Sequence, residues 1–101
     1  MSNRQVLITL TVPPPIEESV VDWLLQFNPN SGFTSHKANG HSSRVEGLNL
    51  AEQVAGRKNQ IRFQMHILED ELPRFMQGLK NDFAGAGVHY WVTPLVDAGH
   101  I

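Results

Sequence analysis

Two stretches of alternating apolar residues constrain the fold of this chain more than any other feature. In residues 6–12 every second residue is a branched aliphatic, and in residues 60–67 apolar residues alternate strictly with polar ones. A period of two residues is typical of a β-strand that buries one face. Prolines at positions 13–15 follow the first stretch and end it, because proline has no amide hydrogen to donate to a sheet.

An amphipathic helix is expected after each of these strands. Apolar residues recur at helical spacing between Ile16 and Phe27 and again between Leu72 and Phe83, and acidic residues lie near the start of each stretch. A polar strand is expected at residues 33–38, with a turn at Asn39-Gly40. A last strand is expected at residues 88–94, after the helix-ending run Ala-Gly-Ala-Gly.

This order, β-α-β-β-α-β, predicts an α+β fold of the ferredoxin-like type. We expect a single domain over residues 1–101, with a four-stranded antiparallel sheet and two helices on one face. A long connection between the second and third strands is expected at about residues 40–59.

The sheet face away from the helices is predicted to be mixed in character. It would carry Leu7, Thr9, Arg62, Gln64, His66, His89 and Trp91. Such a face is commonly covered by another subunit, so a homo-oligomer is expected. Tryptophan is favoured at interfaces, which fits Trp91 there; the alternative is that Trp91 belongs to the core.

Composition excludes several classes of function. The chain has no cysteine, which rules out disulfides and thiolate chemistry, and no apolar run approaches the length of a membrane span. No cleavable leader is recognised, so a cytoplasmic protein without membrane insertion is expected. Residues 37–62 carry five basic and two acidic residues, a balance of 5 − 2 = +3. This charge suits a small anion and is too small for a nucleic-acid surface.

The histidines leave two interpretations open. There are five histidines, and His36 and His41 flank the Asn39-Gly40 pair, so they are candidate metal ligands. Their spacing matches no closed zinc motif, and surface or interface histidines are the other interpretation. No nucleophile motif of the Gly-x-Ser-x-Gly type is present, so an enzyme is not expected.

Several segments together resemble one known family. "GFTSHKANGHSSR", "EQVAGR" and "HYWVTPLVDAG" resemble an uncharacterised subfamily of PII-like proteins, within the superfamily of the nitrogen regulatory protein PII and CutA. Members of that subfamily are often encoded beside heavy-metal efflux transporters. The resemblance implies a trimer, a long T-loop between the second and third strands, and an adenine nucleotide bound between subunits.

The resemblance also indicates candidate ligand-binding residues, and several of them depart from the family pattern. Together with residue chemistry it gives this candidate set: Thr34, Gly40, His41, Ser42, Ser43, Arg44, Arg57 and His89. Thr34 matches a position that contacts the nucleotide base in the family, whereas Gly40, Ser42 and Ser43 could offer amides and hydroxyls to an anion, with charge from Arg44 and Arg57. His89 stands where the family has a phosphate-binding lysine, Ser42 and Ser43 stand where it has Gly-Arg, and His100 replaces a C-terminal arginine. Neutral imidazoles and hydroxyls do not replace permanent cations, so tight ATP binding in the family's way is not expected.

Two functional hypotheses follow. The first is a PII-like regulatory protein that binds a small effector, such as an adenine nucleotide, near the base of the long loop at subunit interfaces. It would signal to a partner protein such as a membrane transporter. The alternative is a CutA-like trimer that binds a divalent metal, or is associated with metal resistance, and binds no nucleotide.

Overall fold

The structure of the protein is a computed structural model that describes residues 4–27, 32–41, 52 and 57–101. Its strands are β1 (Gln5–Val12), β2 (Thr34–His41), β3 (Arg57–Leu68) and β4 (His89–Leu95). The α-helices are α1 (Glu17–Phe27) and α3 (Leu72–Phe83), each preceded by a short 3₁₀ turn, η1 (Pro14–Ile16) and η2 (Glu69–Glu71). The predicted element order and the α+β class are confirmed.

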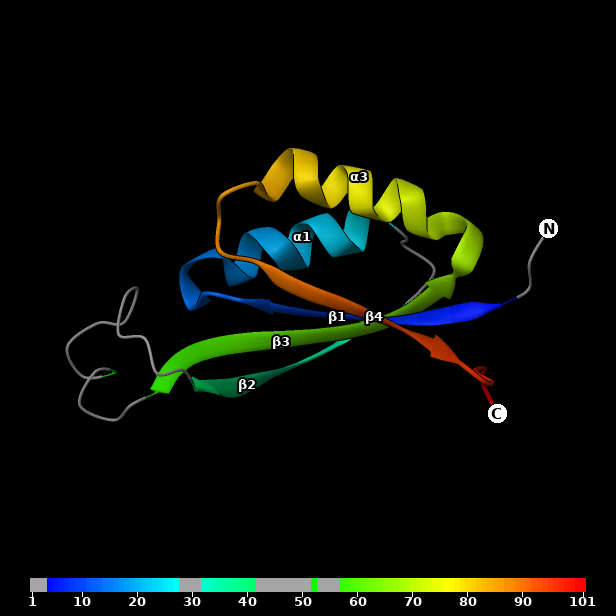
Figure 1. Cartoon of the computed structure of the whole chain (residues 1–101), viewed down its shortest axis with the longest axis horizontal. Coiled ribbons are helices and arrows are strands. Elements are labelled where there is room, and N and C mark those ends of the chain that lie inside the picture. The colour runs from blue at the N-terminus through cyan, green and yellow to red at the C-terminus, as the bar shows by residue number, and fades with distance from the viewer. Residues whose placement is uncertain (1–3, 28–31, 42–51, 53–56) are drawn as a thin grey trace.

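The four strands form one antiparallel sheet in the order β2-β3-β1-β4. Both α-helices lie over the same face of this sheet, as Figure 1 shows. The prolines end β1, as predicted, and Pro14 and Pro15 also provide the first residues of η1. The central position of β1 and β3 places β2 and β4 at opposite edges of the sheet, which decides the geometry of any site built from both.

The turn predicted at Asn39-Gly40 is wrong. Both residues continue β2, where Asn39 pairs with Asn59 and Gly40 pairs with Lys58. Their turn propensity is overridden by pairing along the whole of β2, which runs to His41. The predicted connection at residues 40–59 is therefore shorter, because positions 40, 41 and 57–59 belong to strands; residues 42–51 and 53–56 lie outside the described residues.

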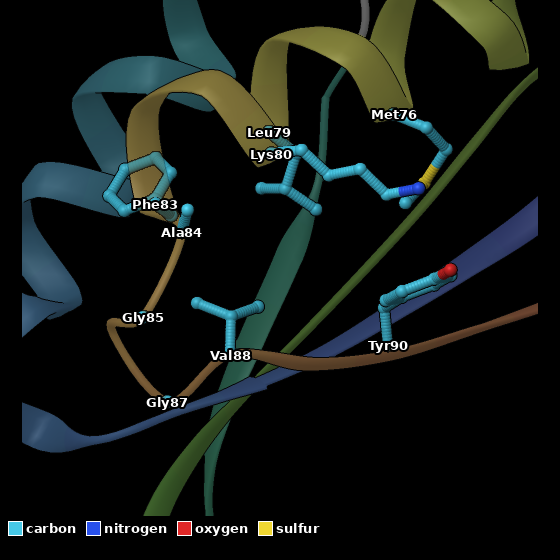
Figure 2. A pocket seen from close by; sticks show the side chains of 9 residues that line it. All are labelled: Met76, Leu79, Lys80, Phe83, Ala84, Gly85, Gly87, Val88 and Tyr90. Carbon is cyan, nitrogen blue, oxygen red and sulfur yellow. The ribbon is translucent and has the colours of Figure 1, made fainter.

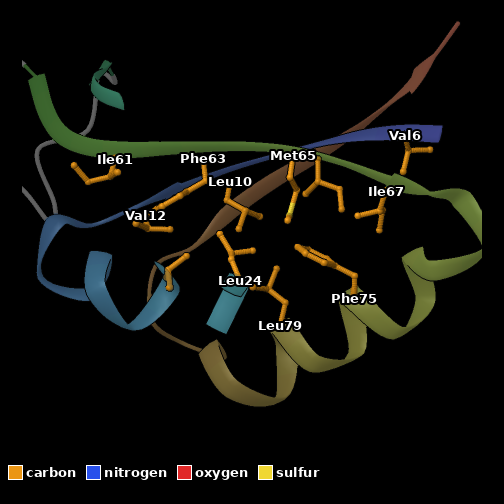
Figure 3. Packing of buried hydrophobic residues seen from close by; sticks show 12 residues of the cluster. Val6, Leu10, Val12, Leu24, Ile61, Phe63, Met65, Ile67, Phe75 and Leu79 are labelled. Atoms are coloured by element: carbon orange, nitrogen blue, oxygen red, sulfur yellow. The ribbon is translucent and has the colours of Figure 1, made fainter. Parts of the chain in front are cut away.

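The core lies between the sheet and the helices, as Figure 3 shows. The alternating positions of β1 and β3 and the helical stripes supply it, as predicted: Val6, Ile8, Leu10, Val12, Val20, Leu24, Ile61, Phe63, Met65, Ile67, Phe75 and Leu79. Phe75 is fully buried and makes edge-to-face contacts with two aromatic rings. The centroid of its ring lies 5.2 Å from that of Trp23 and 5.0 Å from that of Phe27. Trp23 packs partly buried against this core and donates a hydrogen bond to Asp82.

The sheet face away from the helices, called the open face below, has the residues predicted for it. The register aligns Thr9 with Gln64 and Trp91, and Thr11 with Arg62 and His89. Trp91 is 45% exposed in the single chain, so the alternative of a core tryptophan is wrong. Thr9 and Thr11 are nevertheless buried, because larger side chains on both neighbouring strands cover the middle of the sheet.

Candidate ligand-binding site at the two sheet edges

The far end of the β2–β3 hairpin gathers three of the candidate residues. Gly40 pairs with Lys58, and His41 pairs with Arg57, at the end where β2 stops and β3 starts. A Cβ on Gly40 would lie 2.9 Å from Oε1 of Gln60, so glycine leaves room for the Gln60 side chain. Ser42, Ser43 and Arg44 lie outside the described residues.

Positive charge dominates this hairpin. β2 and β3 contain four lysines or arginines and no aspartate or glutamate. Arg57 is exposed and Lys58 is half-buried, and they are adjacent at the hairpin end. Two of the five basic residues in the predicted concentration of charge, Arg57 and Lys58, lie at this end of the fold, where they can attract an anion. The carboxylate of Glu52 lies there too and accepts a hydrogen bond from the backbone N–H of Asn59.

Thr34 is not close to this hairpin end. It starts β2, whereas His41 ends it, and seven residues of extended chain separate the two by about 23 Å. Thr34 pairs with Gln64, and its side chain lies on the open face. The structure therefore splits the predicted residues of β2 into two groups.

His89 lies at the opposite edge of the sheet. It is the first residue of β4, it is exposed, and it aligns with Thr11 on the open face. Three strand spacings, about 14 Å, separate β4 from β2 across the sheet. One small ligand therefore does not contact His89 and the residues of β2 within a single chain.

The two candidate metal ligands also lie apart. His36 aligns with Arg62 on the open face, whereas His41 is five residues further along the strand and therefore points to the other face. Zinc binds histidine nitrogens at about 2.1 Å, so one ion within one chain does not reach both. Among the residues that the structure describes, no group of three or more His, Cys, Asp or Glu side chains is placed to hold a metal.

A contact on the open face adds a residue that the sequence analysis did not select for a site. The guanidinium carbon of Arg62 lies 5.5 Å from the ring centroid of Trp91, within the range of a cation–π contact. The Nε atom of Arg62 is buried and has no hydrogen-bond partner among the described residues. An unpaired buried donor costs free energy, so the cation–π contact with Trp91 is made at the expense of this donor. The sequence indicated that both side chains share a face, but strand register brings them into contact.

Comparisons with known proteins give the fold a context. The sequence profile of a family described as "Protein of unknown function (DUF3240)" matches residues 1–101. No curated protein matches the sequence. The crystal structure of a DUF3240 family protein from Shewanella baltica OS155 is similar, with a TM-score of 0.75 and 20% identity over 100% of this chain and 99% of that one.

Two other solved structures share the fold at lower identity. CPII from Thiomonas intermedia K12, a nitrogen regulatory PII-like protein bound to ADP, AMP and bicarbonate, has a TM-score of 0.71 and 14% identity, covering 97% of both chains. CutA1 from Pyrococcus horikoshii has a TM-score of 0.70 and 12% identity, covering 93% of this chain and 86% of that one. No helix among the described residues is long and apolar enough to cross a membrane.

Proposed function

We propose that this protein, which belongs to the DUF3240 family and shares the fold of PII-like proteins, is a regulatory protein. It would bind a small anionic effector between copies of itself. The effector class is an adenine nucleotide, and the chain acts on a partner protein without catalysis. The expected partner is a membrane transporter, and the assembly is a trimer.

The position of the candidate residues at opposite sheet edges carries this proposal. Gly40, His41 and Arg57 lie at the β2 edge, and His89 lies at the β4 edge. A ligand contacts both groups only where the β2 edge of one copy meets the β4 edge of another. In this proposal the ligand needs residues from two copies, which assembly would bring together.

The open face supports assembly independently. Trp91 is exposed in the single chain, and Arg62 has a buried donor without a partner among the described residues. A second copy would remove the exposed indole from water, which favours assembly through this face. This part of the proposal concerns the interface and does not depend on the identity of the effector.

Charge at the hairpin end favours a nucleotide with few phosphates. Arg57 supplies one permanent cation, and the adjacent Lys58 points to the other face of the sheet. Histidine at position 89 is not a permanent cation of the kind that arginine or lysine provides. The structural relative CPII is bound to ADP and AMP. We therefore expect AMP or ADP to bind more tightly than ATP, whose additional phosphate would lack a matching cation.

A metal-binding protein of the CutA type is the second candidate, supported by the fold shared with CutA1 and by the surface histidines. Because His36 and His41 point to different faces of β2, a shared ion would need ligands from two copies. This candidate predicts that divalent metal, and not nucleotide, stabilises the assembly.

Calorimetric titration and thermal melting with AMP, ADP, ATP, Zn²⁺ and Cu²⁺ separate the two candidates. Binding of AMP or ADP that Arg57→Ala weakens by about tenfold or more supports the proposed function, since hydrogen bonds to charged groups contribute strongly. Arg74→Ala is the matched control, because Arg74 is an exposed arginine on α3 far from the hairpin end. A metal response that His36→Ala or His41→Ala abolishes supports the second candidate.

The remaining outcomes reject parts of the proposal. Stabilisation by none of the five compounds rejects both ligand candidates. Light scattering after size exclusion measures the assembly separately, and a monomer at micromolar concentration would reject a site shared between copies.

A further inference from the structure

A pocket of about 310 Å³ lies between α3 and β4, on the helix-covered side of the sheet. Figure 2 shows the helix above it, β4 below it, and the Gly85–Gly87 turn closing one end. Its walls are apolar, with Met76, Leu79 and Phe83 from the helix and Val88 from the position just before β4. A volume of this size is at the lower end of the range for small-molecule sites, about 300–1,000 Å³.

This pocket is distinct from the site proposed above. Tyr90 lines it and aligns with Leu10, whose side chain is in the core, so both lie on the helix side of the sheet. His89 aligns with Thr11 and lies on the open face. Successive residues of a strand point to opposite faces, so the sheet separates the pocket from the open face.

Two polar groups stand at the end of the pocket away from the glycine turn. In Figure 2 the Lys80 side chain runs along the pocket so that its Nζ and the Oη of Tyr90 lie toward the same end. Neither group has a hydrogen-bond or ion-pair partner among the described residues. Tyr90 is 47% exposed, so the residue is accessible from solvent. The pocket thus combines apolar walls with one cation and one hydroxyl donor.

We propose that this pocket binds a small monocarboxylate with an apolar body. The apolar body would lie against Met76, Leu79, Phe83 and Val88, and the carboxylate would accept hydrogen bonds from Lys80 Nζ and Tyr90 Oη. One cation and one neutral donor match a single negative charge, whereas a phosphate dianion would remain partly uncompensated beside apolar walls. The closed end and the small volume fit a free small molecule.

Lys80 also has a simpler role that the experiment must separate from ligand binding. It lies in the last turn of α3, where a positive charge interacts favourably with the helix dipole. That role predicts lower stability on removal of the charge and no effect on any ligand. Recognition of a carboxylate predicts a change in affinity that depends on the charge of the ligand.

The test titrates the full chain with sodium octanoate and, as matched probes, with octanol and octylamine. Binding is measured by calorimetry and by amide chemical shifts in two-dimensional NMR spectra. Octanoate is expected to bind at least about tenfold more tightly than the other two probes and to shift the resonances of residues 76–90. Lys80→Met, which keeps an unbranched side chain, should weaken octanoate binding about tenfold or more, and Tyr90→Phe should weaken it severalfold.

Lys37→Met is the matched control, because Lys37 is an exposed lysine on the strand at the other sheet edge. It should leave octanoate binding unchanged. The proposal is rejected if octanol binds as well as octanoate, if Lys80→Met retains full affinity, or if octanoate shifts no pocket resonance. Nucleotide binding is measured on other residues, so either proposal can fail while the other stands.

Discussion

Replacing Gly87 by alanine tests the turn that closes the pocket and leads into β4. Gly87 has a φ of +84°, in the left-handed region that L-residues rarely adopt. Forcing alanine into this region costs about 1–2 kcal/mol. In addition, the new Cβ would lie 3.2 Å from Cγ of Pro13, whose ring cannot rotate away as a flexible side chain does.

Two other glycines separate these contributions. Gly85 has a φ of +77°, and a Cβ added there would have no neighbour within 4 Å, so Gly85→Ala adds backbone strain alone. Gly99 has neither a positive φ nor a close neighbour, so Gly99→Ala should be neutral or slightly stabilising. Gly99→Ala is therefore expected to be the most stable of the three variants, Gly85→Ala less stable, and Gly87→Ala the least stable.

Thermal unfolding followed by circular dichroism measures this order. For 101 residues, each kcal/mol corresponds to a shift in Tm of about 5 °C. Gly85→Ala should lower Tm by about 5–10 °C and Gly87→Ala by about 10–15 °C, at one fixed protein concentration because assembly affects Tm. Equal Tm values for Gly85→Ala and Gly87→Ala would refute the contact with Pro13. If Gly85→Ala and Gly87→Ala both have the same Tm as Gly99→Ala, the left-handed conformation of the turn is itself refuted.

Three further substitutions test the core and the open face. Phe75→Ala should lower the free energy of unfolding, measured by urea denaturation, by about 3–5 kcal/mol, because Phe75 is fully buried between two rings. Leu25→Ala, at an exposed position, should lower the same free energy far less. Asp82→Ala removes the carboxylate oxygen that accepts the 2.8 Å hydrogen bond from Trp23, and it should lower the free energy of unfolding by about 1 kcal/mol in the same assay. Asp82→Asn keeps a carbonyl oxygen and should retain most of that stability. If the open face is the interface, Trp91→Glu should reduce the molar mass of the assembly measured by light scattering. Leu25→Glu, at an exposed position on α1, should leave that mass unchanged. An unchanged mass with Trp91→Glu would place the interface elsewhere.

Burial on one face is the property that the sequence predicted best. The alternation in residues 6–12 and 60–67 assigned Ile8 and Phe63 to the core and Thr9 and Arg62 to the open face, as found. Local propensity predicted less well where pairing competed with it, as at Asn39 and Gly40, which continue a strand. The candidate ligand-binding residues were chosen by residue type and resemblance, and neither indicates how far apart they lie.

The sequence by itself determined the α+β class, the element order and the buried faces of β1 and β3, because hydrophobic period indicates which side chains leave water. Only the tertiary structure decided that β2 and β4 occupy opposite edges, so that His89 and Arg57 lie at different edges of the same sheet. It also decided that Lys80 and Tyr90 share a pocket, because their proximity depends on how α3 packs over β4. Such long-range placement arises from the packing of whole elements, which no local pattern of residues encodes.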